Sequence, residues 1–162
     1  MDKISPCLWF NGNAEEAVNF YVSIFPNSRI NEIVLWPMDG TGPNAGTRKG
    51  DVLALEFVLA GRLFRAINSR VAFPFTEAIS LAVACKDQAE VDLFWNTLVE
   101  NGGKEVVCGW LKDKFGLSWQ IVPQRIYDLL VDPDTAKAAR AMTAMLDMVK
   151  IDLAAIEKAV RG

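Results

Sequence analysis

The 162-residue chain contains no histidine. Because imidazole is the commonest metal ligand and general base near neutral pH, that chemistry would fall to other side chains. The three cysteines, Cys7, Cys85 and Cys108, are odd in number and lack any CxxC spacing. We therefore expect neither a disulfide framework nor a zinc site, and we expect these residues to be reduced thiols in the core or in strands.

An excess of positive charge and long apolar runs are also missing. The net charge is −3, and the Lys and Arg residues are dispersed without a basic stripe, so we expect no nucleic-acid partner. The longest apolar runs, such as residues 79–85, are too short to cross a bilayer. The first residues lead into a strand pattern instead of a secretory signal. These features predict a cytoplasmic protein with no membrane partner.

What the sequence does contain is a duplicated strand-then-helix pattern. Asn13 and Asp87 are candidate helix N-caps that lie 74 residues apart, and each is followed three positions later by a glutamate, Glu16 or Glu90. This spacing predicts a capping box at the start of each helix. Apolar and aromatic residues recur at matching positions along both helices, which indicates two copies of one unit.

Extended segments surround each predicted helix, so each unit reads as βαβββ and the fold class as α+β. We expect strands at residues 4–10, 30–36, 52–59 and 63–68 in the first unit and at 79–85, 105–110 and 117–122 in the second. We treat the chain as one domain, 1–162, with module one at about 1–72, module two at about 73–125 and C-terminal helices at 126–160.

Two further segments carry specific expectations. The Gly-rich loop 39–50 is either a lid or a mobile connection, and we favour the connection. In the C-terminal part, Asp134 and Asp152 are expected to cap helices. The helix after Asp134 carries an apolar face that we expect to cover the sheet or a second subunit; it contains Ala138, Met142, Met145, Leu146 and Val149.

The segment 108–123, CGWLKDKFGLSWQIVP, predicts a hairpin. Lys112, Asp113 and Lys114 would form its solvated tip. If Gln120 faces the inside of the sheet, strand alternation places Ser118 and Val122 on the same face, and Trp119 and Ile121 under the helices. On the neighbouring strands, the inward residues would be Ser80 and Ala82, together with Phe64, Ala66 and Asn68 or their neighbours.

Residues 11–30, 75–95 and 108–123, together with the closing helices, resemble the PhnB-like proteins, often labelled 3-demethylubiquinone-9 3-methyltransferase domain. That group belongs to the vicinal oxygen chelate superfamily of glyoxalases, extradiol dioxygenases and bleomycin-resistance proteins. The resemblance implies that the paired modules curl into an incomplete barrel, usually within a homodimer, whose cup holds a metal ion or an apolar ligand.

The same resemblance places metal ligands on the first and last strands of each module. Counting from the helices, the first-strand positions here hold Pro6 and Ser80. On the last strands, Gln120 lies four residues beyond the turn glycine, and Asn68 is at the comparable strand end of module one. Neutral amides and a hydroxyl offset little of the cost of dehydrating a cation, so we expect no metal and no cofactor. A methyltransferase site is disfavoured, because the glycines at 40–42 do not lead from a strand into a helix.

These residues favour binding of a small, partly aromatic organic ligand in the cup of a homodimer. The predicted ligand-binding residues are Trp9, Asn68, Ser80, Trp110, Ser118 and Gln120. One alternative is a glyoxalase-type, metal-dependent lyase, isomerase or dioxygenase that uses Gln120 and Asn68. Another is a dimerisation or partner-binding module in which the strand side chains simply fill the barrel. The sequence leaves open whether the protein is an enzyme.

Overall fold

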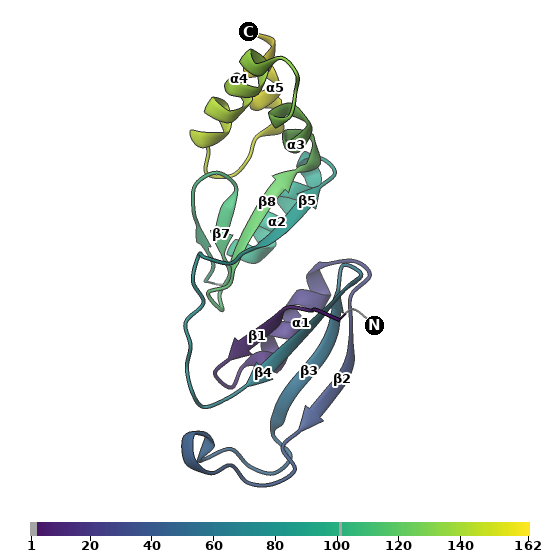
Figure 1. Cartoon of the computed structure of the whole chain (residues 1–162), viewed down its shortest axis with the longest axis vertical. Helices are drawn as coiled ribbons and strands as arrows, with labels where there is room; N and C mark the ends of the chain where they lie inside the picture. The colour runs from purple at the N-terminus through teal and green to yellow at the C-terminus, as the bar shows by residue number, and fades with distance from the viewer. Residues whose placement is uncertain (1–2, 101) are drawn as a thin grey trace. The chain divides into compact units, whose positions relative to one another are not determined.

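The computed structural model describes residues 3–100 and 102–162, and Figure 1 shows how its elements follow one another. The chain divides into two compact units, Met1–Pro74 and Phe75–Gly162. Each unit contains one four-stranded sheet, and neither sheet closes into a barrel.

The first unit has the predicted βαβββ order. Its elements are β1 (Cys7–Phe10), α1 (Ala14–Ile24), β2 (Arg29–Leu35), the short 3-10 helix η1 (Gly42–Asn44), β3 (Val52–Leu59) and β4 (Arg62–Asn68). The strand order is β1-β4-β3-β2. Strands β1 and β4 are parallel, whereas the other neighbours are antiparallel.

The second unit repeats this topology. Its first part comprises β5 (Leu81–Cys85), α2 (Gln88–Val99), β6 (Lys104–Glu105), β7 (Trp110–Lys112) and β8 (Ser118–Pro123). The order is β5-β8-β7-β6, with β5 parallel to β8 and the other pairs antiparallel. The identical pairing pattern confirms the duplication and the α+β class that the sequence predicts.

The two helices begin in different ways. At α2 the predicted cap is confirmed, because Asp87 Oδ1 accepts a hydrogen bond from Glu90 N at 2.9 Å. At α1 the predicted cap is wrong, since the Asn13 side chain makes no capping hydrogen bond. Asn68, at the end of β4, takes over: its Oδ1 accepts from Ala14 N at 2.8 Å. A residue distant in sequence therefore satisfies a free amide at the start of α1.

The predicted strand at 105–110 is wrong, because the chain reverses between β6 and β7. Cys108 and Gly109 both have positive φ, 58° and 76°. Val106 N donates to Trp110 O at 2.8 Å across this turn. A Cβ on Gly109 would lie 2.9 Å from Ile151 Cγ1, so only glycine fits both the backbone conformation and the space.

The C-terminal residues fold into α3 (Gln124–Leu130), α4 (Thr135–Leu146) and α5 (Leu153–Arg161). Asp134 and Asp152 cap α4 and α5 as predicted. The expected apolar face of α4 is only partly buried: Met145 packs on the C-terminal core, whereas Met142 and Leu146 are exposed, and a role in covering a second subunit stays a prediction. Instead of covering a sheet, α4 packs on α3 and α5 around a separate cluster of Val122, Ile126, Leu129, Ala141, Ile151, Ile156 and Val160.

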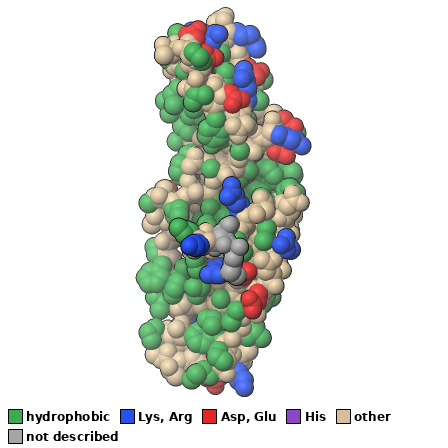
Figure 2. All heavy atoms as spheres, turned by 45° about the vertical axis from the view of Figure 1, so that its right-hand side comes forward, with side chains coloured by type: hydrophobic (Ala, Val, Ile, Leu, Met, Phe, Trp, Pro, Cys, Tyr) green, Lys and Arg blue, Asp and Glu red, His purple; other side chains and the backbone are tan. Residues whose placement is uncertain are grey.

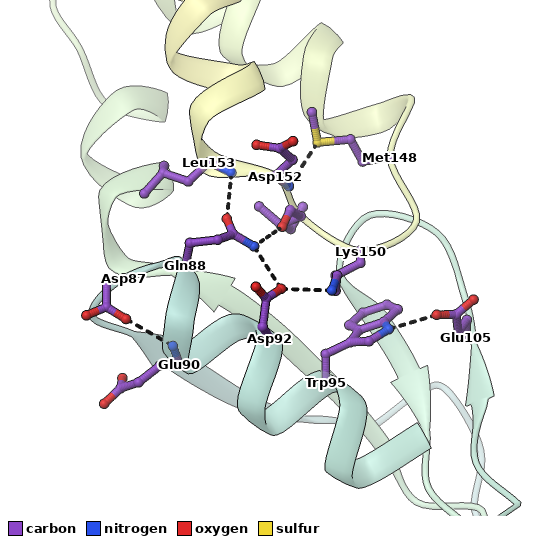
Figure 3. Close-up of polar contacts among 11 residues, drawn as sticks. Asp87, Gln88, Glu90, Asp92, Trp95, Glu105, Met148, Lys150, Asp152 and Leu153 are labelled. Carbon is purple, nitrogen blue, oxygen red and sulfur yellow. Dashed lines mark hydrogen bonds and ion pairs between the residues drawn. The ribbon is translucent and has the colours of Figure 1, made fainter. Parts of the chain in front are cut away.

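Gln88 joins this C-terminal part to the start of α2 (Figure 3). Its Nε2 donates to Ile151 O at 3.0 Å, and its Oε1 accepts from Leu153 N at 2.9 Å. Beside it, Lys150 Nζ lies 2.8 Å from Asp92 Oδ1, and this bond lowers the pKa of Asp92. One amide side chain thus satisfies two backbone groups of the segment that precedes α5.

The surface agrees with the dispersed charges of the sequence. Figure 2 shows basic and acidic side chains in small mixed groups with hydrophobic areas between them. Within the described residues, no helix combines the length and apolar content needed to span a membrane.

Candidate functional site

The second sheet has one face under α2 and one open face. Trp95 of α2 donates from Nε1 to Glu105 Oε1 at 2.8 Å, and Glu105 is the register partner of Leu111 (Figure 3). Leu111 is in turn paired with Trp119, and both are buried. This row therefore faces the helix, as predicted for Trp119, and the alternate residues of β7 and β8 lie on the open face.

Three of the predicted site residues meet on that open face. Gln120 lies between Ala82 of β5 and Trp110 of β7 in the register of the sheet. Its Nε2 donates to the Oγ of Ser80 at 2.8 Å. Trp110, Ser80 and Gln120 are all half-buried. The arrangement presents an indole, a hydroxyl and an amide side by side.

Ser118 is the next open-face residue along β8, and it is 1% exposed. Its Oγ has no hydrogen-bond partner among the described residues. Its register partner is Lys112, whose Nζ forms an ion pair with Glu77; this bond lowers the pKa of Glu77. An unsatisfied buried hydroxyl costs about 1–3 kcal/mol, so a partner atom supplied from outside would be favoured here.

The predicted solvated tip of the hairpin is wrong for Asp113, which is only 3% exposed. Its Oδ1 accepts from Phe115 N at 2.8 Å and from Leu117 N at 3.1 Å. Its Oδ2 accepts from Trp119 Nε1 at 2.9 Å. Asp113 therefore fixes the turn before β8, and with it the register of the open face.

The first module carries different groups at the equivalent positions. Phe10, the end of β1, lies four residues before the start of α1, whereas Cys85, the end of β5, lies three before that of α2. The alignment of Pro6 with Ser80, which was counted from the helices, is therefore wrong by one residue. By sheet register, the counterpart of Gln120 is Arg65, which lies between Cys7 and Glu56.

Arg65 places an ion pair with Glu56 on the open face of the first sheet at this point. Its Nη2 lies 3.3 Å from Glu56 Oε2, and Asn31 Nδ2 donates to Glu56 Oε1 at 3.4 Å. Sequence reasoning missed Arg65 because the extra residue between β1 and α1 is visible only once the strand ends are known. A permanently charged guanidinium is not a ligand for a metal cation.

The two predicted site residues of the first module have structural partners. Asn68 belongs to the helix-facing row, and besides binding Ala14 N it donates from Nδ2 to Val52 O at 3.0 Å. Trp9 is on the open face, where its Nε1 donates to Val71 O at 2.8 Å and its ring meets that of Phe73 edge-on at 5.3 Å. Their role in ligand binding stays a prediction.

The cysteines differ in environment. Cys85 is fully buried, and burial raises its pKa to about 12, so it is an unreactive thiol. Cys7 is exposed, although partial burial of its sulfur still raises its pKa. Cys7 still lies in a strand, β1, as expected, whereas Cys108 is half-buried in the turn before β7, outside the core and the strands. In the described part of the chain, Cys, Asp and Glu side chains nowhere gather in threes as candidate metal ligands.

Topology and register together define a protein of two βαβββ modules with an added C-terminal helical part. The model of the family described as 3-demethylubiquinone-9 3-methyltransferase matches residues 2–122. The chain belongs to this PhnB-like family of the vicinal oxygen chelate superfamily, which confirms the resemblance in its sequence. The match stops before α3, so the expectation that the resemblance includes the closing helices is wrong.

Solved structures give the same picture. A PhnB protein from Bacillus cereus, which carries the same family description, is 37% identical with a TM-score of 0.65 over 75% of this chain and 99% of that one. A Pseudomonas aeruginosa protein shares the fold, with 23% identity and a TM-score of 0.58 over 74% of this chain and 95% of that one. No curated protein matches the chain significantly.

Proposed function

We propose that the protein binds a small organic molecule without a metal ion, on the open face of the second sheet, in the cup of a homodimer. The observation that carries this proposal is the buried Oγ of Ser118, which has no partner among the described residues, beside the Gln120–Ser80 pair. A buried polar atom without a partner is costly, and it is retained where a ligand or water completes its hydrogen bonds.

The neighbouring groups indicate the ligand chemistry. Trp110 offers an aromatic surface, and its register partner Gln120 uses only Nε2 in hydrogen bonding within the described residues. Its Oε1 is therefore available as an acceptor, and the Ser118 hydroxyl can donate or accept. These groups suit a small, partly aromatic molecule with a hydroxyl or carbonyl oxygen. Trp9 and Asn68, which belong to the first unit, stay ligand-binding residues predicted from the sequence.

The residues favour a site without a metal ion over a glyoxalase-type metal centre. In module two the candidate ligands are the neutral Ser80 and Gln120, and in module one the counterpart of Gln120 is the cation Arg65. None of these offsets the cost of dehydrating a divalent ion. A methyltransferase activity is disfavoured as well, because such a site needs a parallel sheet with a glycine-rich turn from a strand into a helix. Here both sheets are largely antiparallel, and the glycines at 40–42 lead into a 3-10 turn.

A thermal-shift screen with hydroxylated and carbonyl-bearing aromatic compounds tests the binding proposal. A ligand at 100 times its Kd stabilises the protein by about 2.7 kcal/mol, which raises the melting temperature measurably. Replacing Ser118 by alanine should weaken binding by about five- to tenfold through loss of one hydrogen bond. Ser23→Ala, which removes an exposed hydroxyl on α1, is the matched control and should bind like the parent.

Two results would contradict the proposal. Binding that is unchanged in Ser118→Ala would remove the open face as the site. A stoichiometric divalent metal found by elemental analysis of the purified protein would support the glyoxalase-type alternative. Light scattering coupled to size-exclusion chromatography tests the homodimer. A monomer mass would contradict this part of the proposal.

A further inference from the structure

A separate pocket lies within the first unit, at the end of the sheet where α1 begins. Its volume is about 290 Å³, at the small end of the roughly 300–1,000 Å³ of small-molecule sites. It is lined by Gly12, Glu15, Trp36, Thr47, Asp51, Val52, Asn68, Ser69 and Arg70. None of these residues lies on the second sheet, and only Asn68 belongs to the site proposed above.

The loop 39–50 contributes one residue, Thr47, to the wall of this pocket, and specific hydrogen bonds hold the loop in place. Asn44 Oδ1 accepts from Ser69 Oγ at 2.9 Å and from Arg70 N at 3.2 Å. The guanidinium of Arg70 donates from Nη2 to Gly46 O at 3.1 Å. Thr47, which follows these two anchors, is 8% exposed. These bonds hold the loop in one conformation, so the wall is preorganised, and whether the loop acts as a lid or as a mobile connection stays a prediction.

The base of the loop is tied in the same manner. Asp39 Oδ1 accepts from Lys49 N at 2.8 Å, and Trp36 exchanges backbone hydrogen bonds with Gly50 and Asp51. A Cβ on Gly40 would lie 2.1 Å from Asn44 O, so the loop folds tightly on itself. A wall of this kind presents its side chains at fixed positions, which lowers the entropic cost of binding.

Three charged side chains line the pocket without pairing with one another. Glu15 and Asp51 are carboxylates, and Arg70 is a cation. Among the described residues, Arg70 forms no ion pair with either carboxylate; its only side-chain bond is to Gly46 O. Asp51 uses Oδ2 for Arg48 N at 2.8 Å, which leaves Oδ1 available. The pocket therefore offers acceptors for two positive groups and donors for one negative group.

From this charge pattern we propose that the pocket binds a small zwitterion with one additional cation, of the size and type of a dibasic amino acid. The ligand carboxylate pairs with Arg70, since guanidinium and carboxylate match in geometry. Its two ammonium groups pair with Glu15 and Asp51. The hydroxyls of Thr47 and Ser69 and the indole of Trp36 add polar and cation–π partners.

A titration followed by ¹H–¹⁵N NMR tests this proposal with three matched probes. L-Lysine carries both ammonium groups and the carboxylate, L-norleucine lacks the side-chain ammonium, and cadaverine lacks the carboxylate. We expect lysine to shift the amide signals of residues 12–15, 47–52 and 68–70 and to bind most tightly. Each of the other two probes should bind about two- to fivefold more weakly, because each loses one partly solvated ion pair.

Charge-neutral variants locate the site. Glu15→Gln and Arg70→Gln should each weaken lysine binding by a similar factor, and raised salt should do the same. Glu32→Gln and Arg62→Gln, which neutralise exposed residues of β2 and β4 outside the pocket, are the controls. Amide spectra that keep the parent dispersion exclude misfolding.

Several results would overturn the proposal. The first is equal affinity for lysine and norleucine. The second is the absence of any shift at about 10 mM lysine, a concentration at which a complex with a millimolar Kd would be mostly formed. The third is a set of shifts that map outside the lining residues. Loss of binding in the control variants as well as in the pocket variants would also count against it. Because the screen on the second sheet uses aromatic compounds and Ser118→Ala, failure of one proposal leaves the other intact.

Discussion

The two modules share one topology, yet their open faces carry different chemistry. Where module one places the ion pair of Arg65 and Glu56, module two places Gln120 beside Trp110. Next to Gln120 is the Ser118 hydroxyl, which has no partner in the part of the chain that the structure describes. The helix-facing rows are largely apolar and buried in both modules, whereas the opposite rows differ in charge and polarity. A binding function is expected on the face that folding does not constrain.

The largest difference in stability concerns the last turn of each module. In module two Asp113 accepts three hydrogen bonds while buried. We expect Asp113→Ala to lower the free energy of unfolding by about 3–5 kcal/mol, because it leaves several buried donors unpaired. Urea unfolding followed by circular dichroism measures this loss.

Asp113→Asn serves as the matched control for that change. Asparagine retains one acceptor for the two backbone amides, but its NH₂ group cannot accept from Trp119. Its loss should be smaller, about 1–3 kcal/mol. Equal stability of the alanine variant and the parent would show that the turn does not depend on the buried carboxylate.

A second contrast concerns how each module starts its helix. Asn68→Ala removes the acceptor for Ala14 N and the donor for Val52 O, so we expect a loss of about 2 kcal/mol in the free energy of unfolding. Asp87→Ala removes the exposed cap of α2 and should cost about 1 kcal/mol. Asn13→Ala should change stability by less than about 0.5 kcal/mol, as for an ordinary surface substitution. A loss at Asn13 equal to that at Asn68 would refute this assignment.

This contrast also shows how far the sequence predicts the structure. Local signals sufficed where the interacting residues are close in the chain. They predicted the helix caps Asp87, Asp134 and Asp152, and they predicted β3 with its bounds Val52–Leu59. They failed where the partner is distant. The Asn68 cap on α1 joins residues 54 positions apart, and no local pattern indicates it.

The candidate site divides in the same way. Strand alternation placed Ser118 and Gln120 on one face, and the bond from Gln120 to Ser80 joins two residues that were selected from the sequence. Asp113 was misjudged because a charged residue in a turn is normally solvated. Its burial depends on bonds to the amides of Phe115 and Leu117 and to the indole of Trp119, six residues further on. The loop pocket depends on bonds between η1 and the end of β4, which sequence alone does not reveal.

Replacing Ser118 should have the opposite sign to the changes above. In the absence of ligand, Ser118→Ala removes a buried hydroxyl without a partner and should raise the free energy of unfolding by about 1 kcal/mol. Its register counterpart in module one is Leu63, where an apolar residue is already present. A gain in stability together with weaker ligand binding would identify Ser118 as a functional residue, whereas a loss of stability would mean that its hydroxyl is satisfied.

The smallest expected effect distinguishes the tight turn of module one from the longer turn of module two. Ala60 and Gly61 connect β3 to β4 with φ of 47° and 80°, a conformation in which an Ala at the first position is strained. Ala60→Asn should raise the free energy of unfolding by about 0.5–1 kcal/mol, because Asn-Gly suits such a two-residue turn. In module two, Gly116 has φ of 86°, so Gly116→Ala should lower the free energy of unfolding by about 1 kcal/mol. The same denaturant titrations measure both changes. A Cβ at Gly116 would meet no described atom within 4 Å, so a loss of stability there cannot come from a steric clash. Opposite signs at the two turns would therefore show that backbone conformation controls both.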